Sequence, residues 1–218
     1  MHPVARSQLA IRLAGTRQPG TAPGNGRQRA CRRHLIFVCE SSRGRTANVR
    51  SYCVLFLCTG NSARSILAEV LLNHWGRGRF RAFSAGSYPK GVVHPLTLKL
   101  LRSLGLPSRG LRSKNWSEFA RPGAPVMDLV VTVCDQAAGE VCPLWPGGPV
   151  TAHWDMADPA AVKGTETERL AAFQTAFHDL SARIRLLISL PVERLDRSAL
   201  EREAKRINRR CPATGKPS

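Results

Sequence analysis

The sequence predicts an α/β fold with a doubly wound parallel sheet, and three features support this. An apolar run at 54–57 ends in Cys58, and turn-forming residues separate it from helix-spaced apolar residues in 66–75. A β-branched run at 127–133 ends in Cys134 and is typical of a central parallel strand. Helical segments separate the two runs. Because ligands bind at the carboxyl edge of such sheets, we expect Cys58 and Cys134 to approach the same crevice.

The turn after the first strand, residues 58–65, has the composition of a site for a tetrahedral oxyanion. Main-chain N–H groups of the turn and the dipole of the following helix place positive potential at one concavity. That potential would lower the pKa of the Cys58 thiol and make it a thiolate near neutral pH. Arg64 can hold two oxyanion oxygens, and Ser65 can donate a hydrogen bond to the sulfur. The expected oxyanion-binding residues are Thr59, Gly60, Asn61, Ser62, Ala63, Arg64 and Ser65.

The remaining elements follow from local patterns along the chain. Residues 79–86 have the pattern of a second strand that ends in a turn, and Pro95 opens a second helix. The residues expected on the inner face of that helix are Leu96, Leu100, Leu101 and Leu104. His94, just before it, fits a capping or packing residue better than a catalytic base. A long amphipathic helix is expected over 166–190, followed by a short helix and a loose tail in 191–218.

Length and charge indicate one domain of ordinary size with tails. The chain has 218 residues, and 33 Lys and Arg against 15 Asp and Glu give a net charge of +18. Residues 1–50 contain ten Arg, no Lys and one acid, Glu40, so +9 of that charge lies before the expected domain. A strongly basic balance can attract nucleic acid, but this segment lacks interleaved aromatic residues. We therefore expect no nucleic-acid partner.

The chain has seven cysteines, an odd number in a sequence with ample apolar residues. This favours free thiols in a reducing compartment over a secreted disulfide framework. No apolar run is long enough to cross a membrane, and no hydrophobic signal core follows Met1. We expect a cytoplasmic protein without a membrane partner, and a monomer.

Residues 1–51 form a basic extension that is expected to lie outside the domain. It could be disordered, a transit peptide, or translated sequence upstream of the true start, and its composition favours disorder or an overlong start. Within it, Cys39 and Arg45 repeat the Cys-x5-Arg spacing after an apolar run at 35–38. We interpret this match as a decoy, either a decayed copy or chance, because no Gly-Asn turn and no amphipathic helix accompany it.

Two further stretches indicate redox and acid–base chemistry. Cys134 and Cys142 lie at the ends of a segment rich in small residues, an arrangement suited to passing on two oxidising equivalents. Asp158 precedes Pro159, and a carboxylate on such a stiff turn can act as a general acid. Asp158 also fits an ordinary helix cap, and the two roles are compatible.

The Cys-x5-Arg-Ser loop with its strand and helix resembles the low-molecular-weight tyrosine phosphatase superfamily. Residues 52–190 look like the arsenate reductases built on that fold and coupled to thiol carriers. The stretches that carry the resemblance are Cys58-Thr59-Gly60-Asn61-Ser62, Ser84-Ala85-Gly86, the Cys134–Cys142 segment, His153-Trp154 and Asp158-Pro159. The resemblance implies a three-layer α/β/α fold with a central four-stranded parallel sheet and a phosphate loop after strand 1. It also implies an oxidoreductase that reduces arsenate to arsenite in arsenic detoxification.

The resemblance implies a role for each matched residue. Cys58 would attack arsenic, Arg64 and the loop amides would hold the oxyanion, and Asp158 would protonate the departing hydroxyl. Cys134 would then attack the Cys58 sulfur and release arsenite, and Cys142 would take over the disulfide. An external thiol donor would reduce it: thioredoxin, glutaredoxin with glutathione, or another low-molecular thiol. No bound cofactor is expected.

Two features depart from the relatives that the sequence resembles. Some of them bind potassium near the loop through asparagine, glutamate, serine and aspartate. Asn61, Glu69 and Ser84 match, but Lys114 stands at the aspartate position. Because the lysine ammonium could replace the cation, we expect no metal. The spacing between the two later cysteines is one residue longer than in thioredoxin-coupled relatives, which leaves the thiol donor open.

Two other functions remain open from the sequence. A phosphatase acting on phosphotyrosine or small phosphomonoesters would use Cys58, Arg64 and Asp158 in its first step, so residual phosphatase activity is expected in either case. Ala160 and Ala161, however, stand where tyrosine phosphatases of the superfamily carry aromatic residues beside their Asp-Pro. A non-enzymatic sensor would instead bind arsenite stoichiometrically through its cysteines and would not need the Asp-Pro acid.

Overall fold

The computed structural model describes residues 50–134, 145–212 and 214. The Cys-x5-Arg match at 39–45 and the expected resolving thiol Cys142 lie outside these residues. The expected extension 1–51 lies almost wholly outside them too.

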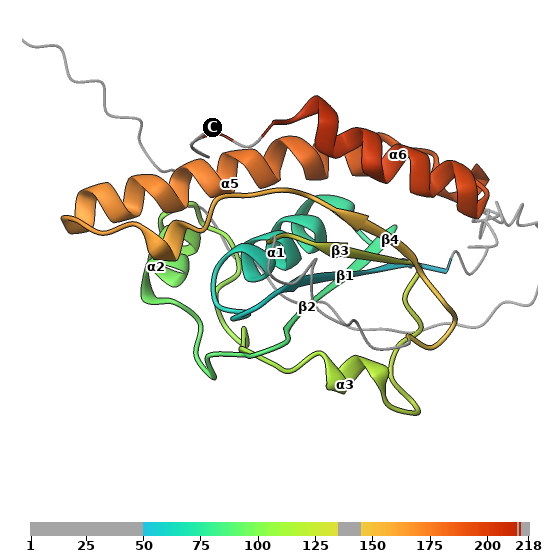
Figure 1. The fold of residues 1–218 in the computed structure, drawn as a ribbon, viewed down its shortest axis with the longest axis horizontal. Helices are drawn as coiled ribbons and strands as arrows, with labels where there is room; N and C mark the ends of the chain where they lie inside the picture. Colours follow the sequence, from blue (N-terminus) through green and yellow to red (C-terminus); the bar gives the residue numbers. More distant parts are fainter. Residues whose placement is uncertain (1–49, 135–144, 213, 215–218) are drawn as a thin grey trace, which may run out of the picture. The chain divides into compact units, whose positions relative to one another are not determined.

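Four strands and their connecting helices make up the described part of the chain (Figure 1). The strands are β1 (Tyr52–Cys58), β2 (Phe80–Gly86), β3 (Leu129–Thr132) and β4 (Val150–His153). The α-helices are α1 (Arg64–Gly76), α2 (Pro95–Ser103), α3 (Ser117–Ala120), α5 (Glu166–Ser189) and α6 (Arg197–Arg210). Two 3-10 turns, η1 (Pro159–Ala161) and η2 (Val192–Arg194), flank α5.

The strands form one parallel sheet in the order β2-β1-β3-β4. The register pairs Cys58 with Gly86, and it pairs Thr132 with both Leu57 and His153. The carboxyl ends of all four strands therefore meet at one edge, where the turn after β1 lies. The four-stranded parallel sheet expected from the resemblance is confirmed.

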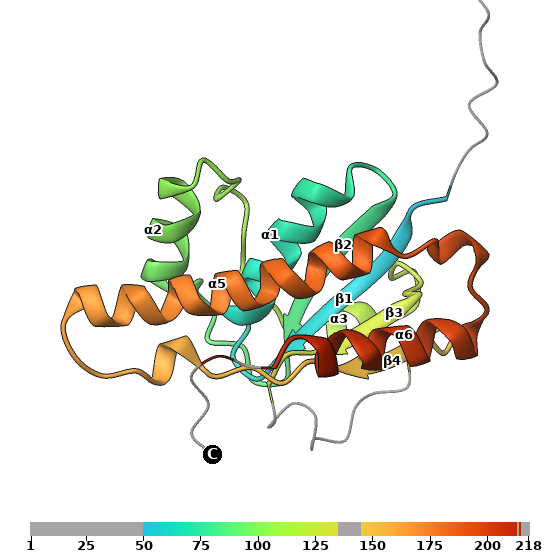
Figure 2. The same ribbon diagram turned by 90° about the horizontal axis from the view of Figure 1, so that it is seen from above.

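Helices cover both faces of the sheet, but unequally (Figures 1 and 2). On one face α1 packs against β1, β2 and α5, with α6 beside β4. The opposite face carries the short α3 and a smaller apolar cluster that includes Phe119 and Trp145. The three layers are thus present, with most of the buried core on the side of α1.

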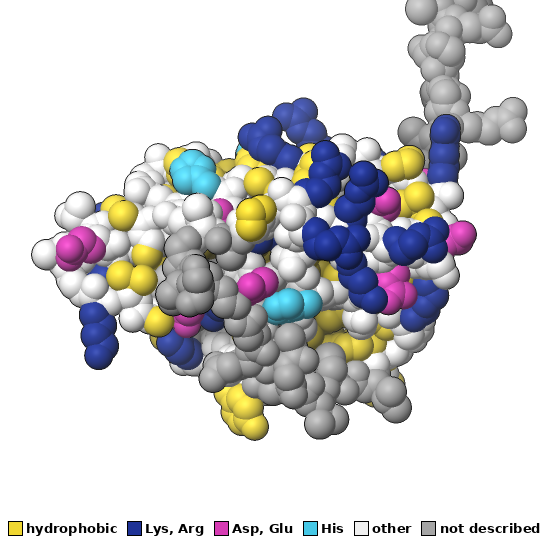
Figure 3. Space-filling model, turned by 45° about the horizontal axis from the view of Figure 1, so that its top comes forward, with side chains coloured by type: hydrophobic (Ala, Val, Ile, Leu, Met, Phe, Trp, Pro, Cys, Tyr) yellow, Lys and Arg dark blue, Asp and Glu magenta, His cyan; other side chains and the backbone are white. Residues whose placement is uncertain are grey.

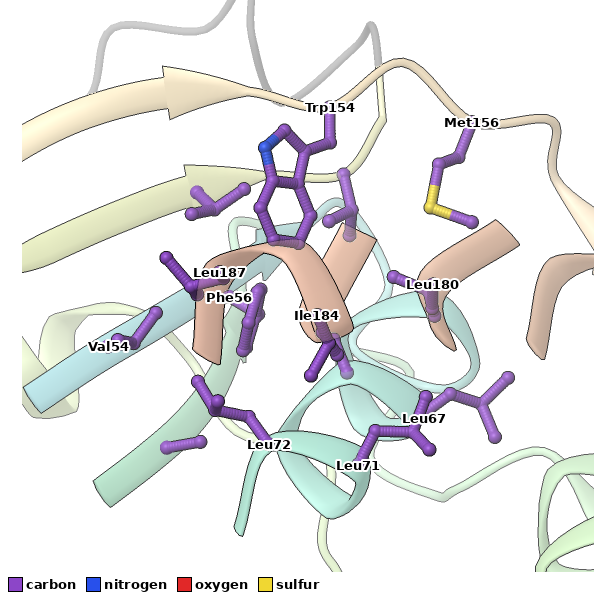
Figure 4. Packing of buried hydrophobic residues seen from close by; sticks show 14 of the residues in the cluster. Val54, Phe56, Leu67, Leu71, Leu72, Trp154, Met156, Leu180, Ile184 and Leu187 are labelled. Atoms are coloured by element: carbon purple, nitrogen blue, oxygen red, sulfur yellow. The ribbon is translucent and has the colours of Figure 1, made fainter. Parts of the chain in front are cut away.

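The core is densest between β1, α1 and α5 (Figure 4). Helix α1 is apolar on nearly all sides because it is enclosed by the sheet and α5. Trp154, just past β4, is fully buried and stacks at a tilt on Phe56, with ring centroids 5.8 Å apart. The indole Nε1–H donates to the Ala204 carbonyl oxygen at 3.2 Å. This contact ties the segment after β4 to both β1 and α6.

The C-terminal segment is more extensively packed than the sequence suggests. Helix α6 has 14 residues, and Leu200, Ala204 and Ile207 belong to the same buried cluster as β1 and α5. The packed core therefore continues past residue 190. The exposed outer face of α6 carries many of the basic side chains that Figure 3 shows gathered on this part of the surface.

Three local details differ from the sequence expectations. Leu104 was expected on the inner face of α2, but it lies just past the last helical residue, Ser103, and is about half exposed. The other expected residues, Leu96, Leu100 and Leu101, are buried. Strand β3 ends at Thr132, so Cys134 lies two residues beyond it. The fourth strand, β4, was expected from the resemblance but was not located along the chain, since its four residues are too few to reveal a period. No helix among the described residues is long and apolar enough to span a bilayer.

Candidate functional site

The turn between β1 and α1 wraps around the sulfur of Cys58. The Asn61 main-chain N–H donates to Cys58 Sγ at 3.2 Å, and Ser65 Oγ lies 2.9 Å from the same sulfur. Asn61 adopts a left-handed conformation with φ of 40°, a region that asparagine tolerates better than most residues. No side chain caps the start of α1 at Ala63, so the first main-chain N–H groups of the helix remain available to an anion.

The Asn61 side chain fixes the turn from the inside. Its Oδ1 accepts a hydrogen bond from the Lys114 main-chain N–H at 2.7 Å, which sets the orientation of the amide. Its Nδ2 donates to Ser65 Oγ and to Ser84 Oγ, each at 2.9 Å. Because Asn61 and both serines are buried, this network holds the loop rigidly relative to β2.

The pocket beside Cys58 has a volume of about 220 Å³ and holds the two expected polar partners. Arg64 and Asp158 both line it and form an ion pair, with Arg64 Nη2 3.2 Å from Asp158 Oδ2. The Arg64 side chain is 12% exposed and that of Asp158 41%. Asp158 Oδ1 also accepts from the Ala160 main-chain N–H at 3.1 Å, so the residue caps η1 as well. The structure therefore brings the Cys58 sulfur, the guanidinium and the carboxylate together.

The segment that carries Asp158 is held in place by buried contacts. The Met156 carbonyl oxygen accepts from Arg64 Nη1 at 3.1 Å. The Asp155 carbonyl oxygen accepts from Arg183 Nη2 at 3.0 Å, and the Asp155 main-chain N–H donates to Asn208 Oδ1 at 2.9 Å. Helices α5 and α6 thus position the carboxylate over the loop.

Cys134 lies against the same loop. Its sulfur is 3.6 Å from Thr59 Oγ1, its side chain is almost fully buried, and it shares a core cluster with Cys58. The two thiols are near enough that Cys134 influences the titration of Cys58. The expectation that both cysteines approach one crevice agrees with this placement. Cys142 lies outside the described residues.

The titration of Cys58 differs from the sequence expectation. Burial, the largest influence, raises the pKa of the Cys58 thiol, and Cys134 adds to this. The Ser65 hydroxyl and main-chain N–H and the Arg64 guanidinium act in the opposite direction. The balance is a raised pKa, because the desolvation of the buried sulfur outweighs the effects of Ser65 and Arg64. This direction is opposite to the lowered pKa that the sequence led us to expect.

The residues that match a potassium site do not fit a cation. Lys114 Nζ lies 3.4 Å from both Glu69 Oε2 and Ser84 Oγ, and its side chain is only 9% exposed. The ammonium therefore occupies the position between these oxygens and would repel a second positive charge. Among the described residues, no group of three or more His, Cys, Asp or Glu is arranged to hold a metal ion.

Two pocket residues were not identified from the sequence. Tyr88 and Lys90 line the pocket, and their main-chain N–H groups donate to the carbonyl oxygens of Thr59 and Gly60, each at 3.0 Å. Lys90 adds a second positive charge to the pocket wall. Their closeness in sequence to the Ser-Ala-Gly turn at 84–86 is the one signal that could have indicated them.

His94 has the structural role expected from the sequence. Its Nδ1 accepts from the Leu96 main-chain N–H at 3.1 Å and so caps α2. Its ring packs against Phe173 with centroids 4.7 Å apart.

Several known proteins are similar to this chain. The family model described as low molecular weight phosphotyrosine protein phosphatase matches residues 53–204. An arsenate reductase of Halalkalibacterium halodurans is 35% identical over 136 residues, which cover 61% of this chain and 91% of that protein.

Two solved structures are similar as well. The arsenate reductase of Archaeoglobus fulgidus is 26% identical with a TM-score of 0.52, covering 63% of this chain and 99% of that one. An arsenate reductase solved in its phosphate-binding state is 25% identical with a TM-score of 0.52, covering 63% of this chain and 97% of that one.

Proposed function

The chain belongs to the low molecular weight phosphotyrosine protein phosphatase family, and we propose that it acts there as an arsenate reductase. The similar proteins that carry this name, by sequence and by structure, support the assignment. The observation that carries it is the placement of Cys134 beside the oxyanion loop, with its sulfur 3.6 Å from Thr59 Oγ1. A phosphatase needs Cys58, Arg64 and Asp158 but has no use for a second buried thiol at that position.

The first step loads arsenic onto Cys58. Arg64, Lys90 and the main-chain N–H groups of the loop bind the arsenate oxygens. The Cys58 sulfur attacks arsenic and forms an S–As bond, while Asp158 protonates the departing hydroxyl, which leaves as water. Because the pKa of Cys58 is raised, the thiol gives its proton to a basic oxygen of the arriving oxyanion as it attacks.

The second step reduces the arsenic. The Cys134 thiolate attacks Cys58 Sγ, the S–As bond breaks, and its electron pair stays on arsenic, which leaves as arsenite. The two sulfurs lose two electrons and form the Cys58–Cys134 disulfide. Cys142 then attacks Cys134, which frees Cys58 and moves the disulfide to the Cys134–Cys142 pair.

An external dithiol or thiol carrier supplies the two electrons that close the cycle. Thioredoxin and glutaredoxin with glutathione are both compatible with the chemistry, and steady-state arsenate reduction with each system separates them. The odd number of cysteines, seven, fits an enzyme of the cytoplasm, where such carriers keep thiols reduced, and we propose that it acts as a monomer.

Cys134→Ser is the decisive variant. We expect it to abolish arsenate turnover while leaving hydrolysis of p-nitrophenyl phosphate within about threefold of wild type, since the loop, Arg64 and Asp158 remain. Cys53→Ser, a change in a cysteine at the opposite end of β1, is the matched control and should retain both activities. Arsenate turnover in the Cys134→Ser protein would refute the proposed cascade.

Phosphomonoester hydrolysis is the second candidate, and one observation favours it. Tyr88 lines the pocket with its side chain largely exposed, so it could contact an aromatic leaving group. If phosphatase activity is the main function, Cys134→Ser and wild type will show equal hydrolysis and wild type will not reduce arsenate with either carrier.

A further inference from the structure

A chain of buried hydrogen bonds connects Lys114 to the sulfur of Cys58. Lys114 Nζ lies 3.4 Å from Glu69 Oε2 and from Ser84 Oγ. Ser84 Oγ donates to Glu69, Asn61 Nδ2 donates to both Ser84 and Ser65, and Ser65 Oγ lies 2.9 Å from Cys58 Sγ.

The donors and acceptors in this chain can be assigned by counting protons. The Ser84 hydroxyl has one proton, which goes to the Glu69 carboxylate, so its lone pairs accept from the Asn61 amide and the ammonium. Ser65 Oγ accepts from Asn61, so its own proton is free for the sulfur. The chain therefore ends with a donor aimed at Cys58, which favours the thiolate over the thiol.

The Ser84 hydroxyl donates to Glu69 because that carboxylate is negatively charged, and the ammonium of Lys114 balances the charge. The Glu69 side chain is 17% exposed, and a carboxylate at such burial is costly without a counter-charge. Arg112 and Glu118 also act on this pair electrostatically, but they are paired with each other at 2.7 Å on the surface. Among the residues that the structure describes, the ammonium of Lys114 is the cation within 3.4 Å of the carboxylate.

Lys114 also holds the loop through its main chain. Its N–H donates to Asn61 Oδ1 at 2.7 Å, and its carbonyl oxygen accepts from the Gly86 N–H at 2.9 Å. These bonds fix the position of the residue for any side chain, so a substitution at 114 tests the ammonium separately from the backbone.

We propose that Lys114 is a tethered cation and a positioning residue: its ammonium takes the place of a free monovalent cation and keeps the hydrogen-bond chain directed at Cys58. Loop reactivity is then independent of the monovalent cation in solution. This inference deepens the proposed function, because it rests on Cys58 being the nucleophile of that reaction.

The test measures alkylation of Cys58 by iodoacetamide in the full-length chain, followed at that residue by mass spectrometry. Rates are recorded across pH in sodium, potassium or methylammonium chloride at equal ionic strength. The variants are Lys114→Ala and Ser84→Ala, and Lys205→Ala serves as the control for loss of an exposed lysine. The assay involves no arsenic, so the inference and the proposed reductase function can fail separately.

We expect wild type and Lys205→Ala to react equally in all three salts. Lys114→Ala should react about tenfold more slowly near neutral pH, the effect of about one pKa unit on the thiol. Potassium or methylammonium should restore a large part of that rate, because either cation can enter the space that the side chain leaves. Alkylation of Cys58 in Ser84→Ala should also be slower than in wild type. No cation should restore this rate, because the hydrogen-bond chain is interrupted between the cation and Asn61.

Three results would overturn the inference. They are a wild-type rate that changes with the cation, a Lys114→Ala protein with a wild-type pH profile, or a slowed Lys114→Ala protein that no cation restores. If Lys114→Ala does not fold, Lys114→Gln replaces it, and the wild-type comparison between salts still decides the question.

Discussion

Arg64 Nη2 lies 3.2 Å from Asp158 Oδ2, so the guanidinium that would bind the oxyanion is already paired with the carboxylate that would protonate its leaving group. Both groups line the pocket beside Cys58. An entering oxyanion therefore competes with Asp158 for Arg64 and brings negative charge next to the carboxylate. Binding and acid catalysis should consequently respond in opposite directions when Asp158 loses its charge.

Asp158→Asn is expected to slow arsenate reduction about 100-fold, because the amide cannot act as a general acid. The variant should at the same time bind phosphate more tightly than wild type, since Arg64 is released and one negative charge is removed. Initial rates and titration calorimetry with phosphate measure the two effects. The cap on η1 is retained, because asparagine also accepts from the Ala160 N–H.

Asp196→Asn is the matched control, since Asp196 caps α6 away from the pocket through a bond to the Ala199 N–H. It should leave both the rate and the phosphate affinity unchanged. Weaker phosphate binding in Asp158→Asn would show that the carboxylate positions Arg64 rather than competing with the anion.

Gly86 is predicted to be required for the shape of the loop. A Cβ at this position would lie 2.4 Å from the Thr59 carbonyl oxygen and 3.0 Å from the Asn61 main-chain nitrogen. Since both are backbone atoms, the loop itself would have to move. Gly86→Ala should therefore weaken phosphate binding at least about tenfold, the loss of roughly one charge-assisted hydrogen bond.

Gly76→Ala separates this effect from stability. Its Cβ would meet Phe80 Cβ at 2.9 Å, at the end of α1 remote from the loop. Overpacking there should lower the melting temperature, at a cost of about 1–3 kcal/mol, and leave phosphate affinity intact. Equal loss of phosphate affinity in both variants would contradict a specific role for Gly86.

The first strand, its turn and α1 could be predicted from sequence because their determinants are adjacent in the chain. Cys58, Arg64 and Ser65 belong to one continuous motif between a recognisable strand and helix, so spacing and context together indicate that they share a site. Asp158 could be added to the site because it precedes Pro159 in a stiff turn. Cys134 could be added because it follows the β-branched run at 127–133, and the strands of a parallel sheet end at one edge.

Other parts of the site depend on tertiary packing and left little trace in the sequence. Tyr88 and Lys90 reach the pocket only because the chain after β2 turns back along the loop. The sign of the Cys58 pKa shift is set by complete burial, which no local pattern specifies. Strand β4 is formed by pairing with β3, so its position in the chain could not be assigned from the local pattern.

Arg183 is predicted to stabilise both the fold and the segment that carries Asp158. It is fully buried in α5 and donates to the carbonyl oxygens of Asp179, Asp155 and Cys211. Arg183→Met leaves these carbonyls without their donor. We expect a loss of about 3 kcal/mol in the free energy of unfolding, because three carbonyl oxygens each lose a donor at a cost of about 1 kcal/mol or more. Arsenate turnover should fall as well, because Asp155 lies in the same short segment as Asp158.

Arg185→Met is a control on the same helix. Arg185 is exposed and lies over the Trp75 ring at 4.5 Å, a contact that contributes about 0.5–1 kcal/mol. Denaturant unfolding should show a small loss of stability for this variant and unchanged turnover. A similarly small loss for Arg183→Met would indicate that its three hydrogen bonds are replaced by water.

Stability should decline at mildly acidic pH through His94. Burial, with Arg169 and Lys90, lowers the pKa of His94 in the folded chain, while Asp158 acts in the opposite direction. The unfolded chain therefore takes up the proton at a higher pH than the folded chain does. The stabilising contribution is fully present above the unfolded value of about 6.5 and is lost as the pH falls below it. Protonation also removes the Nδ1 lone pair that caps α2.

The difference between wild type and His94→Asn isolates this contribution, because asparagine can cap the helix but does not titrate. The denaturant midpoint of wild type should fall more steeply between pH 7.5 and pH 5 than that of His94→Asn. His74→Asn, a change in an exposed histidine near the end of α1, should keep the wild-type slope. Parallel curves for wild type and His94→Asn would mean that His94 is not the group whose protonation destabilises the fold.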